Sequence, residues 1–391
     1  MELAHRLDQI TPSLTLSIAQ QASELRRQGI KVWDFSAGEP DFDTPLPIKE
    51  AAMRALQAGK TKYGPVAGIP ELKQAITDRL RQDYNLHYSP DQVIVTNGGK
   101  QALYNLMMCL LNPGEEVIIP SPYWVSYPEM VRLAGAEPIF LPTTWERDYK
   151  ITPLQLAEAI TPRTRLFVFN SPANPTGSVY SPTEVAALAQ VLENHPQVWV
   201  VADEIYSQII YPPAVHCSIA HYLPDRTLLV SGFAKAYAMT GWRVGYLVGN
   251  REIIKATAKL QGHSTSNVCT FAQYGALQAL TGDQGCVAEM RQAYAERRHL
   301  AYKFLSTTAG LHCPLPQGAF YLFPDISQTG LSSLEFCERL LREKQVALVP
   351  GIAFGADQCV RLSYATDPTT IAEGCQRVQE FVAGLLALQP Q

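Results

Sequence analysis

A single lysine, Lys235, stands in the otherwise apolar stretch "SGFAKAYAMTGWRVGY" (231–246), and no other charged residue lies between Arg226 and Arg243. Burial disfavours the charged form of a lysine, so it lowers the pKa and favours the free amine. A free amine attacks carbonyl groups and can hold an aldehyde cofactor as a Schiff base. The ordinary alternative is a surface lysine on a loop, so the rest of the chain has to decide.

Other polar groups follow apolar runs. Gly98 and Gly99 in "TNGGKQAL" lie where backbone N–H groups at a helix start can converge on an anion. Asn174 lies in the proline-rich turn "SPANPTG", and "ADEIY" places Asp203 and Tyr206 at the end of another apolar run. Taken singly, these residues are equally typical of a tight turn, a proline turn and a helix N-cap.

Two arginines complete the set. Arg243 follows Lys235 by eight residues and can hold a phosphate, whereas Arg361 in "VRLSYAT" suits a bidentate contact with a carboxylate. A phosphate cradle, an asparagine, an aspartate with a tyrosine, a lysine and two arginines are together the groups that pyridoxal phosphate requires. The combination is specific although each member is ambiguous.

Apolar runs separated by helical patterns predict the elements that position these residues. Such runs are typical of a mostly parallel sheet covered on both faces, which binds ligands at the carboxyl ends of its strands. The predicted strands are 92–96, 115–120, 165–170, 197–204, 227–233 and 244–249.

The last hundred residues have a different pattern. A helix at about 286–307, the runs "AFYLF", "VALVP" and "VRLSYA", and a closing helix at 369–387 predict a smaller α+β domain. The first 40 or so residues fit no strand of the main sheet, so we expect them to pack with this smaller part. The predicted division is a large domain at 45–285 and a small domain formed by 1–44 and 286–391.

Composition narrows the class of protein. The 391 residues are 47% hydrophobic and 17% charged with a net charge of −4, which favours neither nucleic acid nor a membrane surface as partner. Eight scattered cysteines without a CxxC pair predict no metal site and no disulfide framework. The N-terminus lacks the apolar core of a signal peptide, so we expect a cytoplasmic protein. The sequence contains no GxGxxG motif at the start of a helix, which disfavours a dinucleotide-binding oxidoreductase.

The chain resembles the class I aminotransferases of the fold-type I pyridoxal phosphate superfamily over essentially its whole length. The stretches that carry the resemblance are "AGEPDFDTP", "KYGPVAGIPELK", "SPYWVSYPEM", "NSPANPTG", "DEIY", "SGFAKAYAMTGWRVGY" and "VRLSYAT". The likeness is strongest to bacterial and plastid-type aspartate aminotransferases. It implies a mostly parallel seven-stranded sheet with a smaller α+β domain, a homodimer with shared active sites, and amino acid and 2-oxo acid substrates.

The resemblance also implies cofactor-binding roles. Lys235 would form the Schiff base and then, as a free amine, move a proton at the substrate Cα. Asp203 would keep the pyridine nitrogen protonated, and Asn174 and Tyr206 would hydrogen-bond the phenolic oxygen. Trp124 would stack on the ring.

The phosphate would be held by backbone N–H groups and by side chains. The resemblance implies the N–H groups of Gly98, Gly99 and Lys100, the guanidinium of Arg243, and Tyr63 reaching the phosphate of a neighbouring subunit.

For the substrate, Arg361 would pair with the α-carboxylate, and Gly38 would leave room for a backbone contact there. Lys100, with Thr15 from the N-terminal segment, would reach a side-chain carboxylate. The implied substrate-binding residues are thus Gly38, Trp124, Asn174, Arg361, Lys100 and Thr15.

One departure from the family pattern concerns hydroxyl groups near the lysine. Many relatives carry serine immediately before it, and some also three residues before it, where this chain has Ala234 and Gly232. Ser231 or backbone groups would have to replace them at the phosphate.

Several activities remain open at this point. An aspartate aminotransferase is the first expectation, and transamination of prephenate to arogenate is the second because prephenate also carries a second carboxylate. Pyridoxal phosphate lyases and an aminocyclopropane carboxylate synthase share the lysine, aspartate and arginines, since the cofactor requires them. A catalytically silent regulator is disfavoured, because no DNA-binding module is added and no catalytic position is missing.

Overall fold

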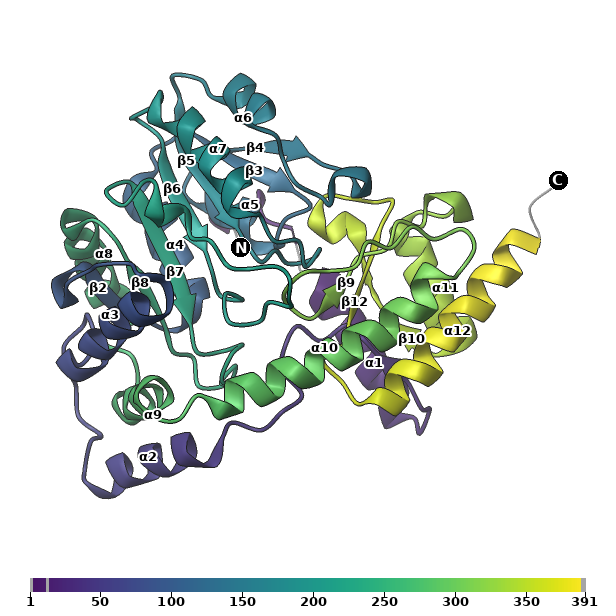
Figure 1. The fold of residues 1–391 in the computed structure, drawn as a ribbon, viewed down its shortest axis with the longest axis horizontal. Helices are drawn as coiled ribbons and strands as arrows, with labels where there is room; N and C mark the ends of the chain where they lie inside the picture. Colours follow the sequence, from purple (N-terminus) through teal and green to yellow (C-terminus); the bar gives the residue numbers. More distant parts are fainter. Residues whose placement is uncertain (1–2, 12–13, 388–391) are drawn as a thin grey trace.

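A seven-stranded sheet forms the centre of the larger part of the molecule, in the order β2-β8-β7-β6-β5-β3-β4 (Figure 1). The computed structural model describes residues 3–11 and 14–387. Strand β8 runs antiparallel to β2 and β7, and the other pairings are parallel. The mostly parallel seven-stranded sheet is thereby confirmed. Its strands are β2 (Val93–Thr96), β3 (Glu116–Ser121), β4 (Glu137–Pro142), β5 (Thr164–Asn170), β6 (Trp199–Asp203), β7 (Thr227–Gly232) and β8 (Gly245–Val248).

Helices cover both faces of this sheet because its strands are apolar on both sides. In β5, Leu166 and Val168 pack with one cluster of buried residues, while Phe167 and Phe169 pack with another on the opposite face. The helices are α1 (Leu14–Arg27), α2 (Leu46–Gln57), α3 (Pro70–Tyr84), α4 (Gly98–Leu110), α5 (Ser126–Leu133), α6 (Pro153–Ala159), α7 (Pro182–Glu193), α8 (Arg251–Ser264), α9 (Thr270–Thr281), α10 (Gly285–Ser306), α11 (Ser333–Lys344) and α12 (Pro368–Ala387).

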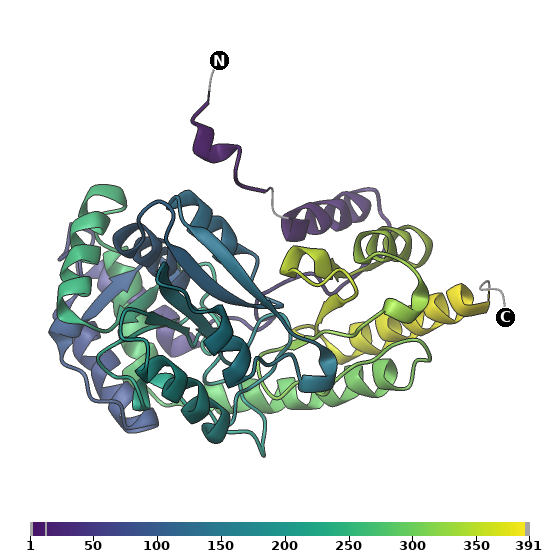
Figure 2. The same cartoon turned by 90° about the horizontal axis from the view of Figure 1, so that it is seen from above.

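The C-terminal part contains two small sheets beside α10, α11 and α12 (Figures 1 and 2). Strands β11 (Val349–Pro350), β12 (Val360–Ser363) and β9 (Tyr321–Leu322) are antiparallel, and β1 (Trp33–Asp34) pairs in parallel with β10 (Val346–Ala347). The run "VALVP" is thus divided between two sheets. The β1–β10 pair joins the N-terminal segment to this part of the chain, while the domain boundaries at 44/45 and 285/286 stay predictions.

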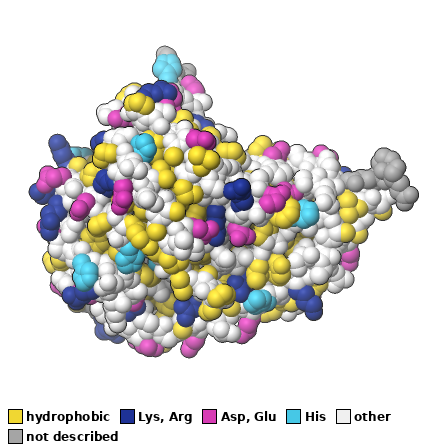
Figure 3. Space-filling model, turned by 45° about the horizontal axis from the view of Figure 1, so that its top comes forward, with side chains coloured by type: hydrophobic (Ala, Val, Ile, Leu, Met, Phe, Trp, Pro, Cys, Tyr) yellow, Lys and Arg dark blue, Asp and Glu magenta, His cyan; other side chains and the backbone are white. Residues whose placement is uncertain are grey.

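Charge is dispersed on the surface. On the face seen in Figure 3, acidic and basic side chains are interspersed and do not gather by sign. Among the residues that the structure describes, no helix is both long and apolar enough to cross a lipid bilayer.

Close packing of glycines brings the end of β7 against the start of α4. A Cβ atom added to Gly232 would lie 2.9 Å from Cα of Gly245, and one added to Gly245 would lie 2.5 Å from the backbone of Gly98 and Gly99. Both separations are too short for non-bonded carbon atoms, so this corner admits no side chain. The missing hydroxyl at Gly232 therefore has a packing cause, whereas Ala234 is half-buried and lines the cleft described below.

The two positions that lack the family's hydroxyl groups, Gly232 and Ala234, should therefore respond differently to substitution by serine. We expect Gly232→Ser to lower the free energy of unfolding by about 1–3 kcal/mol, as overpacking of a core does. Ala234→Ser, the matched control, should change it by less than about 0.5 kcal/mol, since its hydroxyl can project into the cleft. Urea unfolding of both cofactor-free variants, followed by circular dichroism, measures the difference. Equal midpoints would contradict the packing explanation.

Candidate active site

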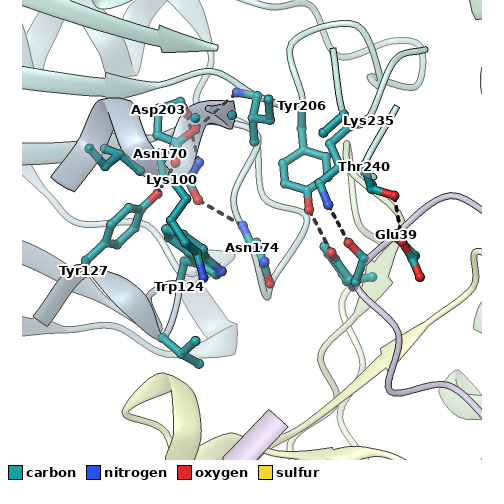
Figure 4. A pocket seen from close by; sticks show the side chains of 18 of the residues that line it. Glu39, Lys100, Trp124, Tyr127, Asn170, Asn174, Asp203, Tyr206, Lys235 and Thr240 are labelled. Carbon is teal, nitrogen blue, oxygen red and sulfur yellow. Dashed lines mark hydrogen bonds between the residues drawn. The ribbon is translucent and has the colours of Figure 1, made fainter. Parts of the chain in front are cut away.

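One cleft at the carboxyl ends of the parallel strands gathers every predicted site residue whose side chain the structure describes, apart from Tyr63 (Figure 4). In that view, Asp203 and Lys100 lie on one side and Lys235 on the other. The predicted residues that line the cleft are Gly38, Gly98, Gly99, Lys100, Trp124, Asn174, Asp203, Tyr206, Lys235, Arg243 and Arg361.

Lys235 follows β7, and its Nζ donates a hydrogen bond to the carbonyl oxygen of Gly38. Burial lowers the pKa of Lys235 to about 8, and the nearby Arg361 guanidinium acts in the same direction. An amine with this pKa is partly unprotonated near neutral pH. It can therefore act both as a nucleophile and as a base.

Asp203 ends β6, and its Oδ2 accepts a hydrogen bond of 2.7 Å from the Tyr127 hydroxyl. Burial raises the pKa of Asp203 to about 6, although the hydrogen bond from Tyr127 opposes the rise. The carboxylate is thus charged at neutral pH in a site with little solvent. A positive or protonated ring nitrogen would be a favourable partner for it.

Arg361 on β12 is 4% exposed, and its charge meets only neutral acceptors. Its Nη1 donates to Oδ1 of Asn174 at 3.0 Å and its Nη2 to the Ser36 carbonyl at 2.9 Å. The guanidinium also lies over the rings of Tyr321 and Phe354, at 4.5 and 5.0 Å from their centroids. Its Nε is buried and has no hydrogen-bond partner among the residues that the structure describes. A buried cation of this kind is suited to a carboxylate ligand.

The start of α4 and Arg243 form a cradle for an anion. Gly98 has a φ of +78°, and a Cβ there would lie 2.5 Å from Nη2 of Arg243. Arg243 donates to the carbonyl oxygens of Thr240 and Asn97, at 2.7 and 3.4 Å. Free N–H groups at a helix start beside a guanidinium fit a phosphate. With Lys235 and Asp203 in the same cleft, these residues fit pyridoxal phosphate.

Lys100 lies at the edge of the cleft, with its Nζ 4.9 Å from the centroid of the Trp124 ring. Burial, and secondarily Arg243, lowers the pKa of Lys100. The cation therefore contacts an aromatic face and stays available to a second anion.

Tyr63 and Ser231 do not line the cleft, and the prediction for Thr15 falls outside the described side chains. The Tyr63 side chain is 92% exposed on the loop between α2 and α3. Thr15 belongs to α1, but its side chain lies outside the described part of the chain. Ser231 points elsewhere: its hydroxyl donates to the Glu204 carbonyl at 3.3 Å, and it does not line the cleft. Ser231 is thus a wrong choice for replacing the missing hydroxyls.

Sequence reasoning missed several residues that build the cleft. Tyr127 holds Asp203, and Asn170 accepts from the Asn174 backbone at 3.0 Å and donates to the Asp203 carbonyl at 2.9 Å. Tyr321 contacts Tyr206. Tyr127 lies in the quoted stretch "SPYWVSYPEM", and Asn170 ends a predicted strand, so position alone could have indicated both. Nothing in "AFYLF" singles out Tyr321.

Four cations therefore line one cleft, and none forms an ion pair with a carboxylate in the described ranges 3–11 and 14–387. They are Lys100, Lys235, Arg243 and Arg361. The same ranges contain no cluster of histidine, cysteine, aspartate and glutamate that could hold a metal ion. The cleft is built to receive several anionic groups.

Known proteins of similar sequence and fold identify the family. Residues 30–378 match the family described as aminotransferase class I and II. An aspartate/prephenate aminotransferase of Cereibacter sphaeroides is 48% identical, over 98% of this chain and 99% of that protein. An aspartate aminotransferase of a Bacillus species is 46% identical, over 97% of this chain and 99% of that protein. A solved Thermus thermophilus aspartate aminotransferase with maleate has a TM-score of 0.94 and 45% identity, over 97% and 99%. The chain belongs to the class I and II aminotransferases and is a pyridoxal-phosphate-dependent enzyme that acts on amino and 2-oxo acids.

Proposed function

We propose that this enzyme transfers the amino group reversibly between L-aspartate and 2-oxoglutarate, giving oxaloacetate and L-glutamate. The observation that carries the proposal is the set of cations without carboxylate partners in the described cleft. Arg243 is available for a cofactor phosphate, Arg361 for an α-carboxylate and Lys100 for a second carboxylate. A dicarboxylic amino acid supplies both of the latter groups, and two charge-assisted contacts favour it over a neutral side chain.

Pyridoxal phosphate, when bound, supplies an aldehyde for the amino group and a ring that withdraws electrons from the substrate Cα. The proposed phosphate ligands are Arg243 and the backbone N–H groups of Gly98, Gly99 and Lys100. Asp203 would hold a proton on the ring nitrogen, since its carboxylate is charged above a pH of about 6. Trp124 would cover one ring face, and Asn174 and Tyr206 would bind the phenolic oxygen.

Lys235 has two proposed tasks. Its Nζ would hold the cofactor aldehyde before substrate arrives, and once released it would take the proton from the substrate Cα and deliver it to the cofactor carbon that carried the aldehyde. A pKa of about 8 leaves part of the lysine unprotonated near neutral pH, as a base requires. The Gly38 carbonyl, which accepts from Nζ, gives the released amine a fixed position.

Prephenate is the second proposed amino acceptor. It carries two carboxylates, so Arg361 and Lys100 can hold it as they hold oxaloacetate. The apolar side chains Leu103, Val125 and Phe354 also line the cleft and offer a surface for its ring. The relative named aspartate/prephenate aminotransferase favours this second substrate.

The role of Lys100 is tested by comparing substrates. Lys100→Ala should lower kcat/KM for L-aspartate about tenfold to a hundredfold, because one charge-assisted contact is lost, and should leave L-phenylalanine nearly unchanged. The assay couples each amino donor to 2-oxoglutarate, with prephenate as an alternative acceptor for aspartate. Arg361→Ala is the matched control, and it should weaken both donors because both carry an α-carboxylate. Equal losses for both donors in Lys100→Ala would contradict the dicarboxylate proposal.

A homodimer with shared active sites is also proposed. Tyr63 is 92% exposed and is not among the described residues that line the cleft, and α2 carries the exposed apolar side chains of Leu46, Met53 and Leu56. The N-terminal arm with the short helix η1 (His5–Leu7) has no buried residue and projects from the body of the molecule (Figure 2). A second copy would cover these groups, and its cofactor phosphate would receive Tyr63.

Sedimentation should accordingly give twice the mass of the chain at micromolar concentration. Tyr63→Phe should keep that mass but raise the dissociation constant of the cofactor about tenfold, since one hydrogen bond to the phosphate is lost. A monomer that binds the cofactor with the same affinity in both forms would contradict the shared site.

A further inference from the structure

Tyr206 and Tyr321 share a single hydrogen bond at the floor of the cleft. Their hydroxyl oxygens are 2.7 Å apart, and within the described part of the chain neither oxygen has another hydrogen-bond partner (Figure 4). Tyr206 follows β6, whereas Tyr321 lies in β9, and both side chains are fully buried or nearly so. The contact therefore joins the part of the cleft built from the main sheet to the part built from the small antiparallel sheet.

Tyr321 also contacts the group proposed to bind the substrate α-carboxylate. The Arg361 guanidinium lies 4.5 Å from the centroid of its ring, and the strand of Arg361 pairs directly with that of Tyr321. The hydroxyl of Tyr321 is 3.3 Å from the position that a Cβ of Gly38 would take. Tyr321 thus lies between Arg361 and Tyr206.

One hydrogen bond between two hydroxyls uses only one of their two protons, and the stronger acid is the favoured donor. A cation near a phenol favours loss of its proton. Burial raises the pKa of both tyrosines and Arg361 opposes both rises, but the guanidinium lies directly over the ring of Tyr321, 4.5 Å from its centroid. Tyr321 is therefore the better donor of the pair.

We propose that Tyr321 is a positioning residue whose hydroxyl donates to Tyr206 and so directs the Tyr206 proton into the cleft, toward the phenolic oxygen of pyridoxal phosphate. A hydroxyl that accepts one hydrogen bond donates a second one more strongly. A carboxylate bound to Arg361 reduces the positive charge near Tyr321 and weakens it as a donor. The substrate α-carboxylate and the cofactor oxygen are thereby coupled, an inference that rests on the proposed function of Arg361 and Tyr206.

Other charged and titratable groups face the tyrosine pair, and all of them except Tyr294, which the control variant changes, remain in place in the variants below. They are Arg361 from β12, Asp203 from β6, Lys235 from the segment after β7 and Tyr294 from α10.

The experiment measures the visible absorbance of the bound cofactor against pH in the complete enzyme. Tyr321→Phe should raise the midpoint of this titration by about 0.5 pH unit or more, because a weaker hydrogen bond from Tyr206 lets the nitrogen joining Lys235 to the cofactor keep its proton to higher pH. Tyr294→Phe is the matched control. Its hydroxyl is buried in the same core and has no hydrogen-bond partner in the described part of the chain, so its removal should leave the midpoint in place.

A second variant tests the hydrogen bond from its other end. Tyr206→Phe should raise the midpoint at least as far, and adding Tyr321→Phe to it should have no further effect. An unchanged midpoint in Tyr321→Phe, or two shifts that simply add, would overturn the proposal. An unchanged midpoint in Tyr206→Phe would overturn it even if Tyr321→Phe did not fold.

The titration also separates this inference from the substrate assignment. If the variants show the expected shifts but the wild-type enzyme does not take the amino group of L-aspartate, the substrate proposal fails and the role of Tyr321 stands. If it exchanges amino groups with L-aspartate and Tyr321→Phe has the wild-type midpoint, the role of Tyr321 fails alone.

Discussion

Burial of positive charge without a carboxylate partner is the constraint on which the cleft depends. An unpaired charge in a protein interior is costly unless dipoles replace the water it has lost. Arg361 meets this requirement with a side-chain amide oxygen, a backbone carbonyl and two aromatic faces. Because these contacts are neutral, the positive charge remains available to an anionic ligand. An aspartate or glutamate in place of these neutral acceptors would have neutralised Arg361 in the empty site and competed with the substrate carboxylate.

The fold supplies those neutral contacts from segments far apart in the chain. The ends of β5 and β6 bring Asn170 and Asp203 together, and the turn after β5 delivers Asn174 to Arg361. Strand β1 pairs with β10 and so holds the N-terminal segment in position, and this segment presents the carbonyl of Gly38 to Lys235. Glycine at the junction of β7, β8 and α4 lets the anion cradle approach the lysine segment. A helix start can then face the cleft without a side chain in between.

Much of this arrangement could be predicted because strand ends and loop chemistry are local features of the sequence. The apolar runs before Asp203 and Asn174 indicated strands, and a parallel sheet brings such ends to one edge. Strand β4 was missed since it is an edge strand with mixed exposure, and its apolar run is only three residues long and lies between two prolines. The division of "VALVP" between two sheets depends on which strands it pairs with in the folded chain, and five consecutive apolar residues do not indicate where the division falls.

Side-chain partners were harder to predict than positions. Tyr321 contacts Tyr206 through a single hydroxyl group, and Tyr321 lies in a different sheet from the strand that precedes Tyr206, so spacing could not reveal it. Ser231 was chosen for its nearness to Lys235 in sequence. Side chains alternate between the two faces along β7, and the Ser231 side chain points away from the cleft. Its hydroxyl instead donates to the Glu204 carbonyl. The proposed role of Tyr63 cannot be seen in a single chain, because the phosphate that its exposed side chain would contact belongs to a second copy.

The central claim is that the cleft holds a cofactor phosphate and both carboxylates of an amino acid while Lys235 moves the proton. The most direct test follows the visible absorbance of the purified enzyme with bound cofactor through a single half-reaction. Addition of L-aspartate should abolish the yellow absorbance, and oxaloacetate, after removal of aspartate, should restore it; Lys235→Ala should do neither at a comparable rate. A spectrum that aspartate leaves unchanged, or a change that no 2-oxo acid reverses, would contradict the account and favour a lyase or a different amino donor.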